Sequence, residues 1–130
     1  IPIVPIMVNT YNPPAQPRVG RCVQFGRMLR DAIEAYPSDA RVGVLASGGL
    51  SHFLVLEDLD RYVLDALGRH DLESLCAIPE ETYVAGTSEI KNWVTVAAAC
   101  DDKTFELIDY VPGYRTAAGT GTGLGFALWT

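Results

Sequence analysis

The sequence predicts an α/β fold, in a single layered domain whose mainly parallel or mixed sheet is flanked by helices. Three stretches carry this prediction. Residues 1–9 are an apolar, β-branched run, residues 19–36 have the apolar spacing of a helix, and residues 41–47 are apolar on both faces. A strand, a helix and a fully buried strand, in that order, are typical of a βαβ unit with parallel strands.

The remaining elements follow from spacing and composition. Three prolines in residues 13–17 remove backbone donors and predict an irregular loop after the first strand. The first helix is expected to end near Pro37, and residues 48–52 to form the loop after the second strand. Apolar spacing predicts further helices over 59–67 and 90–98 and a short one over 71–78, while 103–111 and 124–130 read as closing strands.

Composition narrows the class of protein. The net charge of −6 argues against nucleic acid as a partner. No apolar stretch reaches the roughly 20 residues that cross a bilayer, and the first residues do not resemble a signal peptide, so we expect no membrane partner and a cytoplasmic location. The 3 cysteines form no CxxC pair, and we expect reduced thiols that mostly pack.

His52 is the leading candidate for chemistry, because it follows the glycine pair of "SGGLSH" at the end of a predicted strand. Loops at the C-terminal ends of parallel strands line the ligand crevice. Gly48 and Gly49 allow a sharp turn that fixes the next side chains, although they could also serve the turn alone. A packing or surface role for His52 remains the alternative.

Glu89 is the second candidate. It lies one residue before Ile90 and four before Trp93, and is therefore expected near the apolar face of its helix. A carboxylate in that position needs a partner, and the positive end of the helix dipole is the simplest one.

Three other readings are rejected. His70 lies among charged neighbours in "GRHDLE", so a metal site of His52, His70 and Glu89 is not expected. The glycines of "GTGTGLGF" fit no nucleotide-binding pattern and indicate a turn and close packing. Ser51 is not part of a GxSxG elbow, which argues against a hydrolase.

At "RVGVLASGGLSH" the sequence resembles the class III extradiol ring-cleavage dioxygenases, of the protocatechuate 4,5-dioxygenase and gallate dioxygenase kind. The resemblance extends over nearly the whole chain. It includes the strand, proline-rich loop and helix of residues 4–36 with their Asn-Thr and Arg-Cys pairs, "EIKNW" at 89–93, and "YRTAAGTG" at 114–121.

The resemblance implies roles for individual residues. Glu89 corresponds to the carboxylate ligand of a non-haem Fe(II), and His52 to the acid/base histidine that acts on a catechol-type substrate with O₂. We also expect substrate contacts from Tyr114, Arg115 and Thr116, with Arg115 paired to a substrate carboxylate unless it is an ordinary surface arginine.

One departure from the family shapes the expected organisation. The family takes its two iron-binding histidines from an earlier part of the catalytic chain, and nothing here matches those motifs. We therefore expect residues 1–130 to be the C-terminal part of a larger αβα catalytic domain, completed by the remainder of that chain or by a second subunit, and to function as an oligomer. The alternative is a non-catalytic binding or scaffold module of the same fold, as in the Memo-like proteins.

Overall fold

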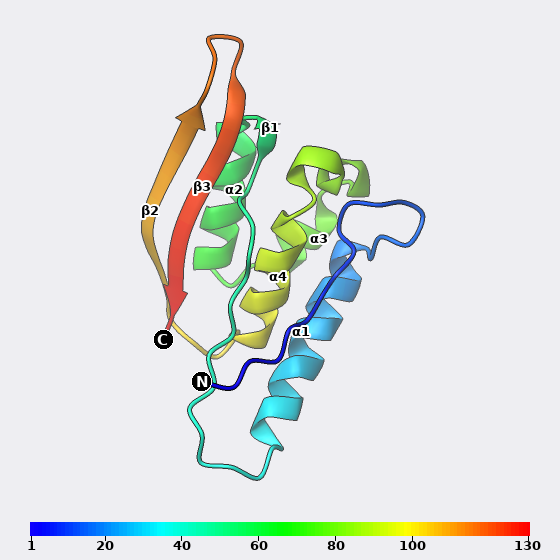
Figure 1. Ribbon diagram of the computed structural model, residues 1–130, viewed down its shortest axis with the longest axis vertical. Coiled ribbons are helices and arrows are strands. Elements are labelled where there is room, and N and C mark those ends of the chain that lie inside the picture. Colours follow the sequence, from blue (N-terminus) through cyan, green and yellow to red (C-terminus); the bar gives the residue numbers. More distant parts are fainter.

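Four α-helices and a three-stranded sheet make up the fold in the computed structural model, which describes residues 1–130 (Figure 1). The helices lie on one side of the sheet, so the chain forms two layers. In chain order the elements are α1 (Val19–Glu34), β1 (His52–Leu54), α2 (Glu57–Gly68), α3 (Leu72–Ala77), the 3-10 turns η1 (Glu80–Tyr83) and η2 (Ala85–Thr87), α4 (Ile90–Ala99), β2 (Phe105–Tyr114) and β3 (Thr120–Trp129).

All four predicted helices are confirmed, with ends within two residues of those expected from the apolar spacing. Their apolar positions face a common core in which α1 packs along α4, and α2 packs on β2 and β3. Gly26 permits the close approach of α1 to α4, because a Cβ there would lie only 2.8 Å from the Cβ of Ala98. None of the helices is long and apolar enough to cross a bilayer.

The α/β class is confirmed, but the sheet differs from the expected parallel arrangement. Its strand order is β1-β3-β2, and both pairings are antiparallel. Strands β2 and β3 form a long hairpin that includes both predicted closing strands, with a register shift between Leu107 and Asp109. The short strand β1, which the sequence assigns to a loop, pairs His52 with Thr122.

The two strands predicted at residues 1–9 and 41–47 are wrong for this chain, because neither stretch joins the sheet. Both are without regular secondary structure, and their apolar side chains lie on the surface: Ile3 is 83% exposed, Met7 95% and Leu45 89%. The β-branched, apolar composition favours an extended backbone, but a strand also needs a neighbour for its hydrogen bonds. No neighbouring strand is available to them here.

The expected close packing of the glycine-rich stretch is confirmed in β3. A Cβ at Gly121 would lie 2.1 Å from the carbonyl oxygen of Gly113, and one at Gly125 would lie 3.1 Å from the ring of Trp93. All three cysteines are free, as expected; Cys22 is buried in the core, whereas Cys76 is exposed. The core itself lies between the helices and the inner face of the hairpin, with Trp93 tilted against Trp129.

Candidate active site

The candidate site is an open pocket of about 680 Å³ where the edge strand β1 pairs with the start of β3. Segments far apart in the sequence form its wall: the N-terminal loop, β1, the turn η2, the residues that lead into α4, and the turn end of the β2–β3 hairpin. The lining side chains are mostly polar or small: Thr10, Tyr11, His52, Phe53, Ala85, Gly86, Ser88, Glu89, Gly113, Arg115, Thr120, Gly121 and Thr122.

His52 and Glu89, the two leading candidates from the sequence, meet in this pocket. Nε2 of His52 lies 2.7 Å from Oε2 of Glu89, and the two side chains are 31% and 41% exposed. Nε2 is itself buried, and its geometry toward the carboxylate does not make a hydrogen bond. The pair is therefore a close contact between an imidazole and a carboxylate, with a ring nitrogen that has no hydrogen-bond partner in the chain.

Glu89 is the residue immediately before the first turn of α4, but its side chain does not cap that helix. The carboxylate therefore lies at the positive end of the helix dipole, the simplest alternative for it, without a capping hydrogen bond there. The side chain faces His52 instead.

The glycine pair provides the space for this contact. A Cβ at Gly48 would lie 2.7 Å from Oε2 of Glu89, and one at Gly49 would lie 2.9 Å from Nε2 of His52. Gly48 also has a φ of +128°, a conformation that other residues rarely adopt. The two glycines therefore do more than form a turn, since a larger residue at either position would displace one member of the pair.

The first residues of α4 hold the glycine loop against the helix. Nδ2 of Asn92 donates a hydrogen bond to the carbonyl oxygen of Ser47 (2.9 Å), and Nε1 of Trp93 donates one to that of Gly48 (3.0 Å). These bonds connect "SGG" to "EIKNW" directly. Because the same helix start carries Glu89, the loop and the carboxylate are fixed relative to each other.

Two pocket residues have a strained backbone. Phe53 has a φ of +66° and Ala85 a φ of +51°, and both line the pocket. Residues with a side chain are uncommon in this region, and such strain is concentrated at functional sites. The surrounding contacts must hold both residues in place.

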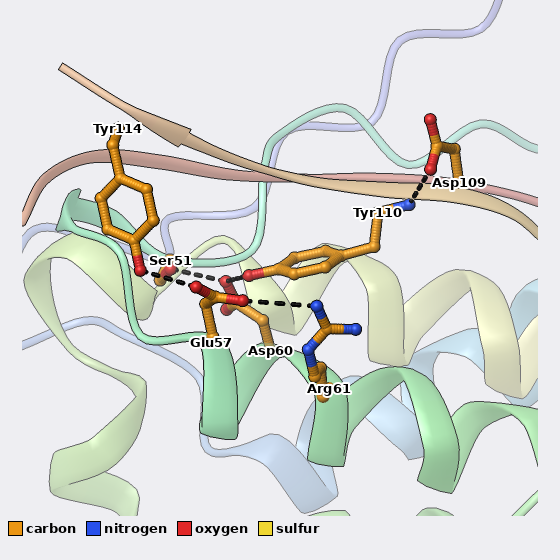
Figure 2. Close-up of polar contacts among 7 residues, drawn as sticks. All are labelled: Ser51, Glu57, Asp60, Arg61, Asp109, Tyr110 and Tyr114. Carbon is orange, nitrogen blue, oxygen red and sulfur yellow. Dashed lines mark hydrogen bonds and ion pairs between the residues drawn. The ribbon is translucent and has the colours of Figure 1, made fainter.

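Of the three residues expected to contact the substrate, only one lines the pocket. Arg115 lines the pocket, is exposed, and takes part in none of the ion pairs of the chain. Tyr114 does not line it, because its hydroxyl donates a hydrogen bond of 2.7 Å to Oε1 of Glu57 on α2 (Figure 2). This bond raises the pKa of Tyr114 and lowers that of Glu57. Thr116 also lies outside the pocket, and its hydroxyl bonds that of Thr120.

His70 does not line the pocket. It follows α2 with a φ of +56°, and its Nδ1 lies 3.7 Å from Oδ1 of Asp101.

Several lining hydroxyl groups were not singled out from the sequence. Thr10 and Ser88 are buried, and their hydroxyl oxygens lie 3.5 Å apart, so they join the N-terminal loop to the start of α4. Thr10 belongs to the Asn-Thr pair noted in the resemblance, which was a usable signal. Nothing in the sequence around Ser88, Thr120 or Thr122 marks them as pocket residues.

The donor set fits only part of a metal site. The chain contains no group of three or more histidine, cysteine or acidic side chains that could hold an ion. Glu89 offers an oxygen donor at the pocket, beside a buried ring nitrogen without a hydrogen bond. An Fe(II) centre with two imidazoles and one carboxylate would need its imidazoles from outside these residues.

Comparison with known proteins identifies the class. Residues 1–125 match the model of the LigB family, described as the catalytic LigB subunit of aromatic ring-opening dioxygenase, and the chain belongs to this family. Among individual proteins, it is similar to the gallate dioxygenase of Pseudomonas putida, with 44% identity over 52 residues. That stretch covers 40% of this chain and only 15% of the relative.

Proposed function

We propose that this chain is the C-terminal part of the catalytic domain of an extradiol ring-cleaving dioxygenase, acting on a catechol-type ring with O₂. The observation that carries the proposal is the contact of 2.7 Å between His52 and Glu89 inside an open, polar pocket. Membership of the LigB family over residues 1–125 and the similarity to a gallate dioxygenase support it.

Glu89 would be the carboxylate ligand of a non-haem Fe(II). The two remaining protein ligands would be imidazoles from the rest of the catalytic chain or from a second subunit. An Fe(II) held in this way would supply the chemistry of binding a catechol and O₂ together. The role of this chain is to hold one anionic oxygen donor at a fixed place, through the bonds that tie α4 to the glycine loop.

His52 would be the general acid and base. Its imidazole would accept a proton at Nε2 from a catechol hydroxyl as the substrate binds, and would return that proton to an oxygen atom of the substrate later in the reaction. Its place beside the metal ligand puts the proton transfer next to the reacting oxygens.

Arg115 would select substrates that carry a carboxylate. Its guanidinium is free of ion pairs within the chain and lines the same pocket as His52. A planar guanidinium binds a carboxylate through two parallel hydrogen bonds. The hydroxyl groups of Thr10 and Ser88 line the same pocket and offer donors for ring substituents.

Gallate-dependent oxygen uptake by the full-length, iron-loaded protein tests the acid/base role. His52→Ala should keep its iron and lose about 10²- to 10⁴-fold in turnover. His70→Ala is the matched control, since His70 is the other histidine of this chain and lies outside the pocket, and it should keep wild-type turnover. A His52→Ala enzyme with more than about a tenth of wild-type turnover would contradict the assignment.

Iron content tests the ligand role. Glu89→Gln should lower the iron retained after dialysis, because the neutral amide is a weaker donor than the carboxylate. Glu81→Gln, at an exposed acidic residue outside the pocket, is the control and should leave iron content unchanged. Iron-loaded wild type without oxygen uptake on gallate, protocatechuate or catechol would instead support a non-catalytic binding module.

A further inference from the structure

Asp60 is a buried carboxylate for which the proposed chemistry has no direct use. It lies in the first turns of α2, its side chain is fully buried, and it does not line the candidate pocket. Burying a carboxylate costs free energy unless hydrogen bonds compensate, and its Oδ1 has no partner. An acid held under these conditions requires an explanation other than stability alone.

The bonds of Asp60 all converge on its other oxygen. Oδ2 accepts one hydrogen bond from the hydroxyl of Ser51 (2.7 Å) and one from the hydroxyl of Tyr110 (2.8 Å), as Figure 2 shows. The Ser51 oxygen in turn accepts a bond of 3.0 Å from the backbone N–H of Leu56. One carboxylate oxygen therefore joins the loop before β1, the start of α2 and strand β2.

Ser51 is the residue immediately before His52, and its backbone is fixed as firmly as its side chain. The N–H of Gly123 donates to the carbonyl of Ser51 (2.8 Å), and the N–H of Leu50 donates to the carbonyl of Gly123 (2.9 Å). Strand β3 thus holds the backbone from one side while Asp60 holds the hydroxyl from α2. Because His52 is the next residue in the chain, the backbone position of Ser51 determines where the His52 ring lies.

Two further features of the backbone around Ser51 fit it to hold His52. A Cβ at Gly123 would overlap Oδ2 of Asp60, so the absence of a side chain in β3 makes room for the carboxylate. On the other side of His52, Phe53 is held in a strained conformation with a φ of +66°. The pairing of Phe53 with Gly121 in β3 and the attachment of Ser51 together hold this strained part of the chain in place.

We propose that Asp60 is a positioning residue, which acts through Ser51 to hold His52 in its place opposite Glu89. The inference rests on the proposed function, in that the held group is the acid/base histidine. Asp60 itself contacts neither substrate nor metal.

Two matched variants separate positioning from general stability. Ser51→Ala and Tyr110→Phe each remove one hydroxyl donor from the same oxygen of Asp60, but only Ser51 is attached to the His52 loop. In the full-length, iron-loaded protein, Ser51→Ala should lower kcat for gallate-dependent oxygen uptake about 10- to 100-fold. KM should change by less than about threefold, because an interaction needed only for proton transfer affects kcat. Tyr110→Phe should keep the wild-type kcat.

The conservative variant at Asp60 provides a second comparison. Asp60→Asn retains an oxygen that accepts both hydroxyl donors and should keep most of the turnover, whereas Asp60→Leu should lose as much as Ser51→Ala. All assays are made well below the melting temperature of each variant. Equal kcat losses in Ser51→Ala and Tyr110→Phe, or no loss in Ser51→Ala, would overturn the proposal.

A readout independent of activity separates this inference from the proposed function. Hydrogen exchange of the peptide that spans residues 48–56 should become faster in Ser51→Ala and remain unchanged in Tyr110→Phe. If the wild type shows no ring cleavage, the proposed function fails, and unchanged exchange in Ser51→Ala would separately overturn the anchoring role of Asp60.

Discussion

The indole nitrogen of Trp93 donates a hydrogen bond of 3.0 Å to the carbonyl oxygen of Gly48, so helix α4 holds the loop that makes room for Glu89. Trp93→Phe removes this bond and should lower the free energy of unfolding by about 1 kcal/mol beyond the loss of ring area. Trp129→Phe is the control, because that indole packs against Trp93 and Phe105 without a hydrogen bond of this kind. Chemical denaturation measures both; equal losses would show that the bond to Gly48 contributes nothing.

Gly49 is the position at which the smallest added side chain should affect His52. The Cβ introduced by Gly49→Ala would lie 2.9 Å from Nε2 of His52 and 3.0 Å from a methyl group of Thr122. The ring must move, and a displacement of about 1 Å in a catalytic group costs on the order of 10²-fold in rate. Oxygen uptake with gallate measures the loss. Gly43→Ala, where a Cβ has open space, should leave the rate unchanged.

Arg115 should affect binding more than turnover. Arg115→Gln removes the guanidinium and should raise KM for gallate about tenfold or more, with little change in kcat. Unsubstituted catechol, which has no carboxylate, should show the same KM in both proteins. A parallel increase for catechol and gallate would assign Arg115 to the shape of the pocket instead.

Ala85 offers a stabilising substitution. Its φ of +51° is unfavourable for alanine and accessible to glycine, so Ala85→Gly should gain about 0.5–1 kcal/mol after the entropy cost of glycine. Thermal melting should show a higher midpoint. Ala118→Gly, in the exposed hairpin turn at a negative φ, should lower the midpoint slightly. The same sign of change at both positions would argue against strain at Ala85.

Asp71 should make stability depend on pH. Its carboxylate caps α3 by accepting bonds from the hydroxyl (2.6 Å) and the backbone N–H (3.0 Å) of Ser74, and these bonds lower its pKa below the ordinary value of 3.8. The folded state therefore holds its proton less tightly than the unfolded state. This contribution is complete above the ordinary pKa and is lost as the pH falls through the lowered value. Melting of Asp71→Asn should fall less steeply than that of the wild type between about pH 5 and pH 2. Parallel curves would contradict the capping role.

The helices could be predicted because their apolar residues recur with the period of a helix and face a core inside this chain. The strands at residues 1–9 and 41–47 could not, since composition indicates an extended backbone but does not supply a neighbouring strand. Their exposed apolar residues, such as Ile3 and Leu45, show how little local sequence says about pairing.

The candidate site was predictable in part. His52 and Glu89 were found from position and resemblance, but their contact depends on the docking of the glycine loop on α4, which no local pattern encodes. Tyr114 and Arg115 were expected together, yet Tyr114 ends β2 and bonds Glu57 on α2, whereas Arg115 follows the strand and lines the pocket. Asp60 stands among other acidic residues in the sequence, and only its burial distinguishes it.

The residues that line the pocket range from Thr10 to Thr122 in the sequence, so segments from most of the chain must pack together before the wall is complete. Contacts between segments so far apart in the sequence raise the contact order and slow folding. A nick, a truncation or a transient opening in one of these segments therefore removes part of the wall, even where it lies far from His52 in the sequence.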